Sequence, residues 1–129
     1  MSIPVDLDRL AEALDDFGSG YLLSVSSAGR VKALTVDPVV REGVVMVLGA
    51  GRGTLANLAG NDAVTLVFPP AQAHGYSLIV DGTGVVVGDD VRIAPATAVL
   101  HRPSAHADGP PPPDGAGEGT SCGEDCRPV

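Results

Sequence analysis

Aromatic side chains are scarce in this sequence, which has two tyrosines, two phenylalanines and no tryptophan among its 129 residues. Such a chain offers almost no surfaces on which the bases of a nucleic acid could stack. Hydrophobic residues still make up 44% of the sequence, which is enough for one core in a domain of this length. Valine, leucine and alanine must therefore fill that core.

Positive charge is also in short supply. Lysine and arginine together number 8 against 16 acidic residues, so the net charge is −8. Nucleic acids and anionic membranes are bound through lysine and arginine side chains that neutralise phosphates, so we expect neither as a partner. No apolar run approaches the ~20 residues that span a bilayer, and the first residues lack the basic and then apolar pattern of a secretion signal. We therefore expect a cytoplasmic protein.

The sequence has only two cysteines, Cys122 and Cys126. In the cytosol they would be reduced unless they form a redox pair or bind a metal. With His101 and His106 they could in principle form a tetrahedral zinc site, but the spacings H-x4-H and C-x3-C are unlike the tighter pairs of common zinc modules. Pairing, zinc binding and free thiols stay open, and we predict free thiols and no metal site.

Hydrophobic periodicity predicts one helix followed by strands. Leu7, Leu10, Leu14 and Phe17 recur at steps of three and four, which indicates an amphipathic helix from Asp6 to about Phe17. Short β-branched runs between glycine-containing turns then predict strands, and a glycine-rich loop at 49–53 leads into a short helix at 54–59. The predicted strands are residues 21–26, 31–40, 44–48, 63–68, 76–87 and 91–100.

Two prolines fall inside these predicted strands. Pro38 marks a bulge or the point where the second strand leaves a central position in the sheet, and Pro95 weakens the middle of the last strand. Six short strands with few helical residues are typical of a mainly β protein with a closed or nearly closed antiparallel barrel.

The composition changes after residue 102. Proline and glycine make up 11 of residues 103–129, and Pro110 to Pro113 are consecutive. A segment with so few large apolar residues buries too little surface to offset its ordering entropy. We predict a barrel domain at 1–102 and a disordered, acidic, Pro/Gly-rich tail at 103–129.

The order of these elements resembles the pyridoxamine 5'-phosphate oxidase-like family of split barrels. The stretches that carry the resemblance are GRGTLANL at 51–58, NDAVTLVFP at 61–69 and YSLIVDGT at 76–83. The resemblance covers about residues 6–100 and implies a six-stranded antiparallel split β-barrel with an N-terminal helix and one short helix. It also implies a homodimer in which FMN or a deazaflavin lies in a groove between two barrels.

In this family the cofactor phosphate is held by basic residues on the second strand and by basic and hydroxyl residues at the start of the short helix. The positions in this sequence that match are Arg30, Lys32, Arg52, Gly53 and Thr54. A helix N-terminus with free N–H groups and a glycine-rich approach also favours an anion on physical grounds alone.

The resemblance implies a flavin- or deazaflavin-binding oxidoreductase of unknown substrate, for which no catalytic residue can be named. The serines on the first strand lack the G-x-S-x-G turn of a hydrolase nucleophile. The short helix starts Arg52-Gly53-Thr54, where flavin-oxidising members usually carry Ser-Arg-Lys. The alternative is therefore a non-catalytic barrel that carries a cofactor or small ligand, or that binds a partner protein. Haem bound through His74 or His101 is a weaker third interpretation.

Overall fold

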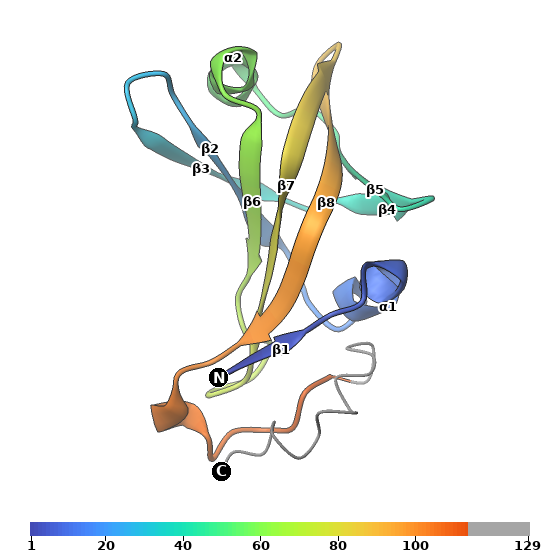
Figure 1. The fold of residues 1–129 in the computed structure, drawn as a ribbon, viewed down its shortest axis with the longest axis vertical. Coiled ribbons are helices and arrows are strands. Elements are labelled where there is room, and N and C mark those ends of the chain that lie inside the picture. The colour runs from blue at the N-terminus through green and yellow to red at the C-terminus, as the bar shows by residue number, and fades with distance from the viewer. Residues whose placement is uncertain (114–129) are drawn as a thin grey trace.

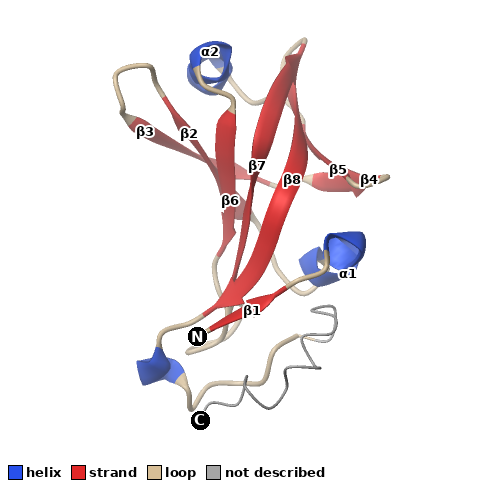
Figure 2. Ribbon diagram, in the orientation of Figure 1, coloured by secondary structure: helices blue, strands red, loops and turns tan. Residues whose placement is uncertain are grey.

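A computed structural model describes residues 1–113, and in this range the chain forms one antiparallel sheet of eight strands with two α-helices and two short 3-10 helices (Figures 1 and 2). The sheet order is β3-β2-β6-β7-β8-β5-β4, and β1 pairs with β8. The strands are β1 (Ser2–Pro4), β2 (Gly20–Val25), β3 (Val31–Val36), β4 (Val39–Arg41), β5 (Val44–Val47), β6 (Ala63–Phe68), β7 (Ser77–Val87) and β8 (Asp90–His101). The helices are η1 (Leu7–Arg9), α1 (Leu10–Leu14), α2 (Arg52–Gly60) and η2 (Ser104–His106).

The N-terminal helix begins where the sequence predicted. The side chain of Asp6 accepts a hydrogen bond from the backbone N–H of Asp8 at 3.0 Å, which caps the first turn. That turn is a 3-10 helix, η1, and continues as α1, from which Leu10 and Ala13 are buried. The apolar stripe therefore faces the barrel, as the periodicity indicated. The helix ends at Leu14 rather than near Phe17 as predicted, because the next three N–H groups bond to carbonyls three residues back, in turns.

The strand predictions are confirmed with two differences. The predicted strand at 31–40 is two strands, because the chain breaks at Asp37 and Pro38 after β3 has paired with β2. The residues beyond the break form β4 and pair with β5 instead. A proline lacks the N–H that a ladder needs, so Pro38 lies at the break between two hairpins. The other difference is β1, a strand of three residues that is too short to show a pattern.

The second proline is accommodated within the long strand β8. The register of β7 and β8 shifts between Asp81 and Gly82, so that Gly82 pairs with Pro95 while Asp81 pairs with Thr97. The residue of β8 between Pro95 and Thr97 therefore forms a bulge. Pro95 lies beside this bulge, where its missing N–H disturbs the ladder least. Along its other edge β8 pairs with β5 near its start and with β1 near its end. β8 thus runs along the open, split barrel and joins β7 on one edge to β5 and β1 on the other (Figure 1).

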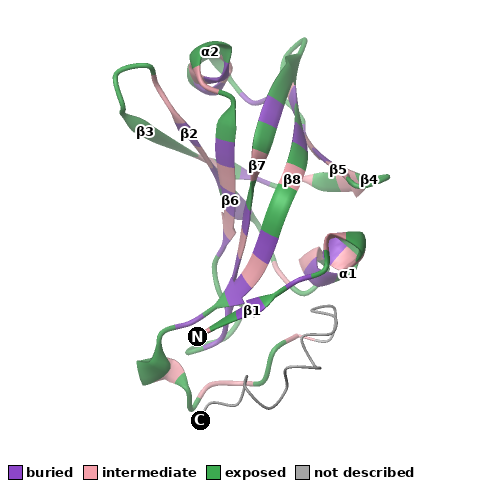
Figure 3. Ribbon diagram, in the orientation of Figure 1, coloured by how far each residue is buried: buried purple, intermediate pink, exposed green. Residues whose placement is uncertain are grey.

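The core lies between the curved sheet and α1, with α2 covering the other end of the barrel. Buried and exposed residues alternate along β7 and β8 (Figure 3). Valine and leucine dominate the core, as the composition indicated, and the largest fully buried side chain is Phe68. The ring of Phe17 lies against it with centroids 6.3 Å apart.

Part of the predicted tail has a defined structure. Residues 103–113 contain η2, and Arg102 donates from its backbone N–H to the carbonyl of Met1 at 3.1 Å. The chain then folds back over the loop between β6 and β7, where His74 contacts Asp108 and His106. The remainder of the predicted tail, with Cys122 and Cys126, lies outside the described residues.

Candidate functional site at the start of α2

Helix α2 lies along the inner face of the β2–β3 hairpin. It begins at Arg52, two residues earlier than predicted, after Gly51 adopts a φ of 82° that favours glycine. The Asn57 amide, near its middle, donates to the buried hydroxyl of Ser24 at 3.0 Å. The last residue of α2, Gly60, lies beside Ser27 at the hairpin end. The start of α2 is therefore held against the middle of β3.

Lys32 and Gly53 meet at this helix start. Lys32 pairs with the buried Ser24 in the β2–β3 ladder, so it lies on the α2 side of the hairpin, opposite Val31 and Ala33 as alternation predicted. A Cβ atom placed on Gly53 would lie 2.7 Å from Cε and 3.2 Å from Nζ of Lys32. The lysine therefore passes directly over the first turn of α2, through space that a side chain at position 53 would fill.

This arrangement gathers positive charge without neutralising it. Gly51 has no side chain to cap α2, so the N–H groups of Arg52, Gly53 and Thr54 have no intrahelical or capping partner. Neither Lys32 nor Arg52 forms an ion pair within residues 1–113. We call Lys32, Arg52 and the exposed amides of Arg52 and Gly53 the α2 start site. In a chain of net charge −8, such a site favours an anion.

Two of the predicted cofactor-binding residues are placed differently from the others. Thr54 is fully buried, and its Oγ1 atom has no hydrogen-bond partner, so neither its hydroxyl nor its N–H is open to the exposed helix start. Arg30 follows the β2–β3 turn, which lies beside Gly60 at the far end of α2. That end is roughly 10 Å from Gly53 at the rise of an α-helix.

A small cleft lies next to the α2 start site. It has a volume of about 230 Å³ and is formed by β3 and by the end of β5 with the loop that follows. Leu34, two residues after Lys32, and Gly49, three residues before Arg52, both line it. We call it the β3–β5 cleft. It is smaller than the 300–1,000 Å³ that is usual for a ligand site. No sequence pattern predicted this cleft, because it is formed by segments that only the barrel brings together.

Within residues 1–113, no group of three or more histidine, cysteine, aspartate and glutamate side chains is arranged to hold a metal ion. His101 and His74, the two predicted haem ligands, are both exposed; His101 bonds to Ser2 at 3.2 Å and His74 to Asp108 at 2.8 Å. In the same part of the chain, no helix has the length and apolar character that a membrane span requires.

Replacing Gly53 with alanine tests phosphate binding at the α2 start site without destabilising the helix. Alanine favours a helix over glycine by up to about 1 kcal/mol, and the clashing atoms belong to the flexible end of Lys32. We therefore expect an unchanged or raised melting temperature together with weaker phosphate binding, measured by calorimetry. Gly60→Ala is the matched control, because its Cβ would meet only Ser27 at 3.9 Å. Equal phosphate binding by both variants would contradict the expectation.

No protein-family model matches the chain. Two curated proteins are 40% identical to it over 138 aligned positions, which cover 95% of this chain and 92% of each relative. They are the uncharacterized proteins Mb0449c of Mycobacterium bovis and MT0457 of Mycobacterium tuberculosis.

Several solved structures share the fold at low sequence identity. A candidate pyridoxamine 5'-phosphate oxidase from Listeria innocua superposes with a TM-score of 0.60 at 12% identity, over 73% of this chain and 96% of that one. The FAD binding protein of Mycobacterium smegmatis gives 0.56 at 19%, over 79% and 100%. The heme storage protein HutZ of Vibrio cholerae gives 0.55 at 14%, over 74% and 93%. The chain is therefore a split barrel of the pyridoxamine 5'-phosphate oxidase-like kind, as the resemblance implied, and belongs to one family with its two mycobacterial relatives.

Proposed function

We propose that this protein is a flavin- or deazaflavin-binding oxidoreductase that holds the cofactor phosphate at the α2 start site. The observation that carries the proposal is the unneutralised group of Lys32, Arg52 and two exposed free amides at one helix start. A flavin is also what the structural neighbour from Mycobacterium smegmatis binds, according to its description as an FAD binding protein. A bound flavin or deazaflavin would supply hydride chemistry, while the protein supplies placement and charge.

The donors of the α2 start site suit a phosphate better than a carboxylate. Amides from two successive residues and two cationic side chains could serve several oxygens of one anion. The adjoining β3–β5 cleft adds apolar walls from Leu34, Val36 and Val47, which suit the flat ring system. Arg30 lies next to the β2–β3 turn, which faces the other end of α2, so we assign it no contact with that group.

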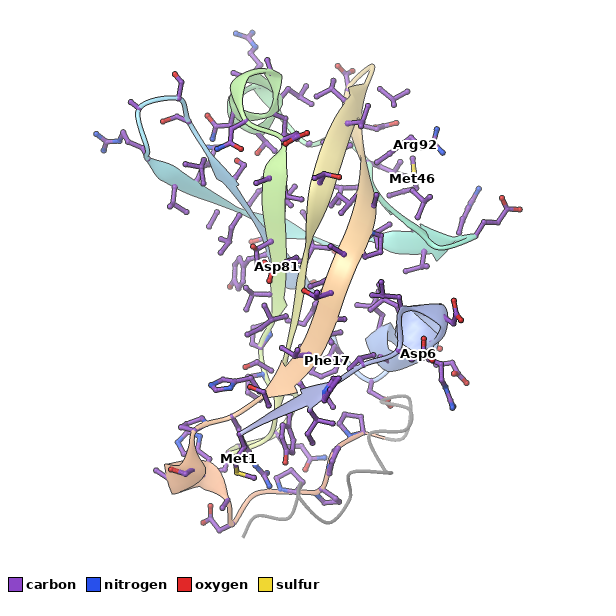
Figure 4. The ribbon with its side chains drawn as sticks, viewed as in Figure 1. Met1, Asp6, Phe17, Met46, Asp81 and Arg92 are labelled. Carbon is purple, nitrogen blue, oxygen red and sulfur yellow. The ribbon has the colours of Figure 1, made fainter. Side chains whose placement is uncertain are left out.

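The proposed site includes a second copy of the chain. At about 230 Å³ the β3–β5 cleft is too small to enclose a flavin by itself. Leu48, at its rim, is 67% exposed and also lines an apolar trough of about 520 Å³ on the outer face of β4, β5 and β8. Met46 and Arg92 lie side by side in that trough (Figure 4). A homodimer that packs on this face would cover Leu48 and complete the cleft.

Titration of the purified protein with FMN and with a deazaflavin, followed by absorbance and fluorescence, tests the proposal. Lys32→Ala should weaken binding by about 10- to 100-fold, since hydrogen bonds to charged groups contribute about 1.5–3 kcal/mol. Arg9→Ala is the matched control, because it removes one positive charge from η1, where Arg9 bonds to the exposed Glu12 at 2.8 Å. The control should bind as the wild type does.

Two results would count against this function. One is the absence of saturable binding by the wild type at millimolar cofactor. The other is equal affinity of the Lys32→Ala and Arg9→Ala variants, which would show that the cofactor binds elsewhere.

A second candidate is a barrel that carries a cofactor without catalysis. The burial of the Thr54 hydroxyl favours it, because one of the expected phosphate contacts is missing. A structural neighbour, HutZ, is described as a heme storage protein, so carriage is compatible with this fold. Reduction of the bound flavin or deazaflavin by an added hydride donor distinguishes the two, because a carrier would bind without turnover. A Soret band on addition of haem would indicate the haem-carrying form.

A further inference from the structure

Residues 110–113 form a proline run that lies against the barrel. Pro110, Pro111 and Pro112 each precede another proline, and this excludes the helical conformation for them. The run is therefore extended, close to polyproline II, in which backbone carbonyls have no internal partner. Such carbonyls are free to accept hydrogen bonds from a receptor.

Arg102 supplies that hydrogen bond from a buried position. Only 5% of Arg102 is exposed, and its guanidinium lies 4.1 Å from the ring centroid of Tyr76. Its Nη1 donates to the carbonyl of Pro110 at 2.8 Å and to that of His74 at 3.1 Å. This buried cation is stacked on an aromatic ring and bonded to carbonyls rather than to a carboxylate. It is therefore suited to binding a peptide backbone through its carbonyl groups.

The surface beneath the run is an aromatic groove. Phe17, three residues after α1, and Tyr76, before β7, form its walls, and Gly75 also lines it. A Cβ on Gly75 would lie 3.7 Å from Cγ of Pro110 and 2.9 Å from the carbonyl of Gln72. We call this surface, with Arg102, the proline groove. Aromatic walls with a side-chain donor to a carbonyl are the recurring way to bind polyproline II segments.

The segment before the run is fitted closely to the β6–β7 loop. Asp108 accepts a hydrogen bond from Nδ1 of His74 at 2.8 Å, and this bond lowers the pKa of Asp108. The rings of His74 and His106 are stacked with centroids 4.0 Å apart. A Cβ on Gly109 would lie 1.9 Å from the carbonyl oxygen of His74, so no other residue fits there. The run itself is held less tightly, since a cavity of about 170 Å³ remains beside it.

We propose that the proline groove is a binding site for proline-rich segments, in which the chain's own residues 110–113 are the resident ligand. The cavity beside the run leaves room for larger side chains. A proline-rich segment of another polypeptide can therefore replace the resident run. This site is separate from the α2 start site and does not depend on the proposed cofactor.

Gly109→Ala in the full chain provides the test, because the added methyl group removes the resident run without changing any residue of the groove. The probe is the synthetic peptide HADGPPPP, which has the sequence of residues 106–113. Binding is followed by NMR shifts of Gly75, Tyr76 and the Arg102 Nε–H. We expect saturable binding at least tenfold tighter than to the wild type, whose groove is occupied. The peptide HADAPPPP, which carries the same added methyl, should not bind.

A second variant keeps the test decisive if Gly109→Ala fails to fold. Replacing the four prolines 110–113 with alternating glycine and serine should open the part of the groove that the run covers. The peptide should bind this variant more weakly than it binds Gly109→Ala, because residues 106–109 still occupy their place beside His74. Adding Arg102→Lys to this variant keeps the positive charge but removes the planar guanidinium group with its several N–H donors. This change should weaken peptide binding by about tenfold. The proposal is overturned if the peptide binds neither opened variant, binds the wild type equally well, or shifts residues outside the groove.

Discussion

Replacing Leu48 with aspartate is expected to convert the protein from a dimer to a monomer. Leu48 is 67% exposed, so its replacement leaves the core of each chain intact. In the proposed dimer it lies between two copies, where an unpaired carboxylate would cost several kcal/mol through lost hydration. Light scattering should show a mass near twice 13.0 kDa for the wild type and near 13.0 kDa for the variant.

The same variant should lose affinity for the cofactor. The β3–β5 cleft is completed by the second copy in our proposal, so dissociation of the dimer opens it to water. Ala11→Asp adds the same charge on the exposed surface of α1 and should change neither the mass nor the affinity. A wild type that is monomeric at all concentrations would rule out this interface and the shared cofactor site with it.

Replacing Phe68 with alanine is expected to destabilise the fold by about 3–5 kcal/mol, the usual range for a buried phenylalanine. Phe68 is 1% exposed, and few other aromatic side chains are available to fill the space it leaves. It also packs on Gly20, whose Cβ would lie 2.5 Å from the Phe68 ring. Since small domains have total stabilities of about 5–15 kcal/mol, the variant would be close to unfolding.

Urea unfolding followed by circular dichroism measures this effect. Phe17→Ala is the comparison, because Phe17 contacts the same ring but is only half-buried, and it should destabilise the protein less. A loss below about 1 kcal/mol for Phe68→Ala would mean that the neighbouring side chains collapse into the cavity.

The sequence predicted those parts of the fold that depend on neighbouring residues. Asp6 caps the first helix through a bond to a residue two positions away, and β6 has the predicted bounds. Lys32 lies on the predicted side of its strand because alternation is a local property of an extended chain. The glycine-rich start of α2 was visible for the same reason.

The candidate site was predicted only in part. Lys32 and Gly53 meet, as their roles required, while Thr54 is buried and Arg30 lies toward the other end of α2. Which residues of a helix turn inward depends on what the helix packs against. A list of matching positions therefore predicted a site at one helix start but could not separate the exposed donors there from the buried residues.

The amino-acid sequence by itself determined the class of the fold, the positions of most strands and the chemical character of the α2 start, since these follow from patterns within a few residues. Only the tertiary structure decided how the two prolines act. Pro38 ends a strand, whereas Pro95 stays in one because Gly82 of the facing strand has no side chain at the bulge. It also decided that Arg102 and the proline run of the predicted tail meet over Tyr76. Such contacts join segments far apart in the chain, and their free energy is set by shape and burial that no single segment encodes.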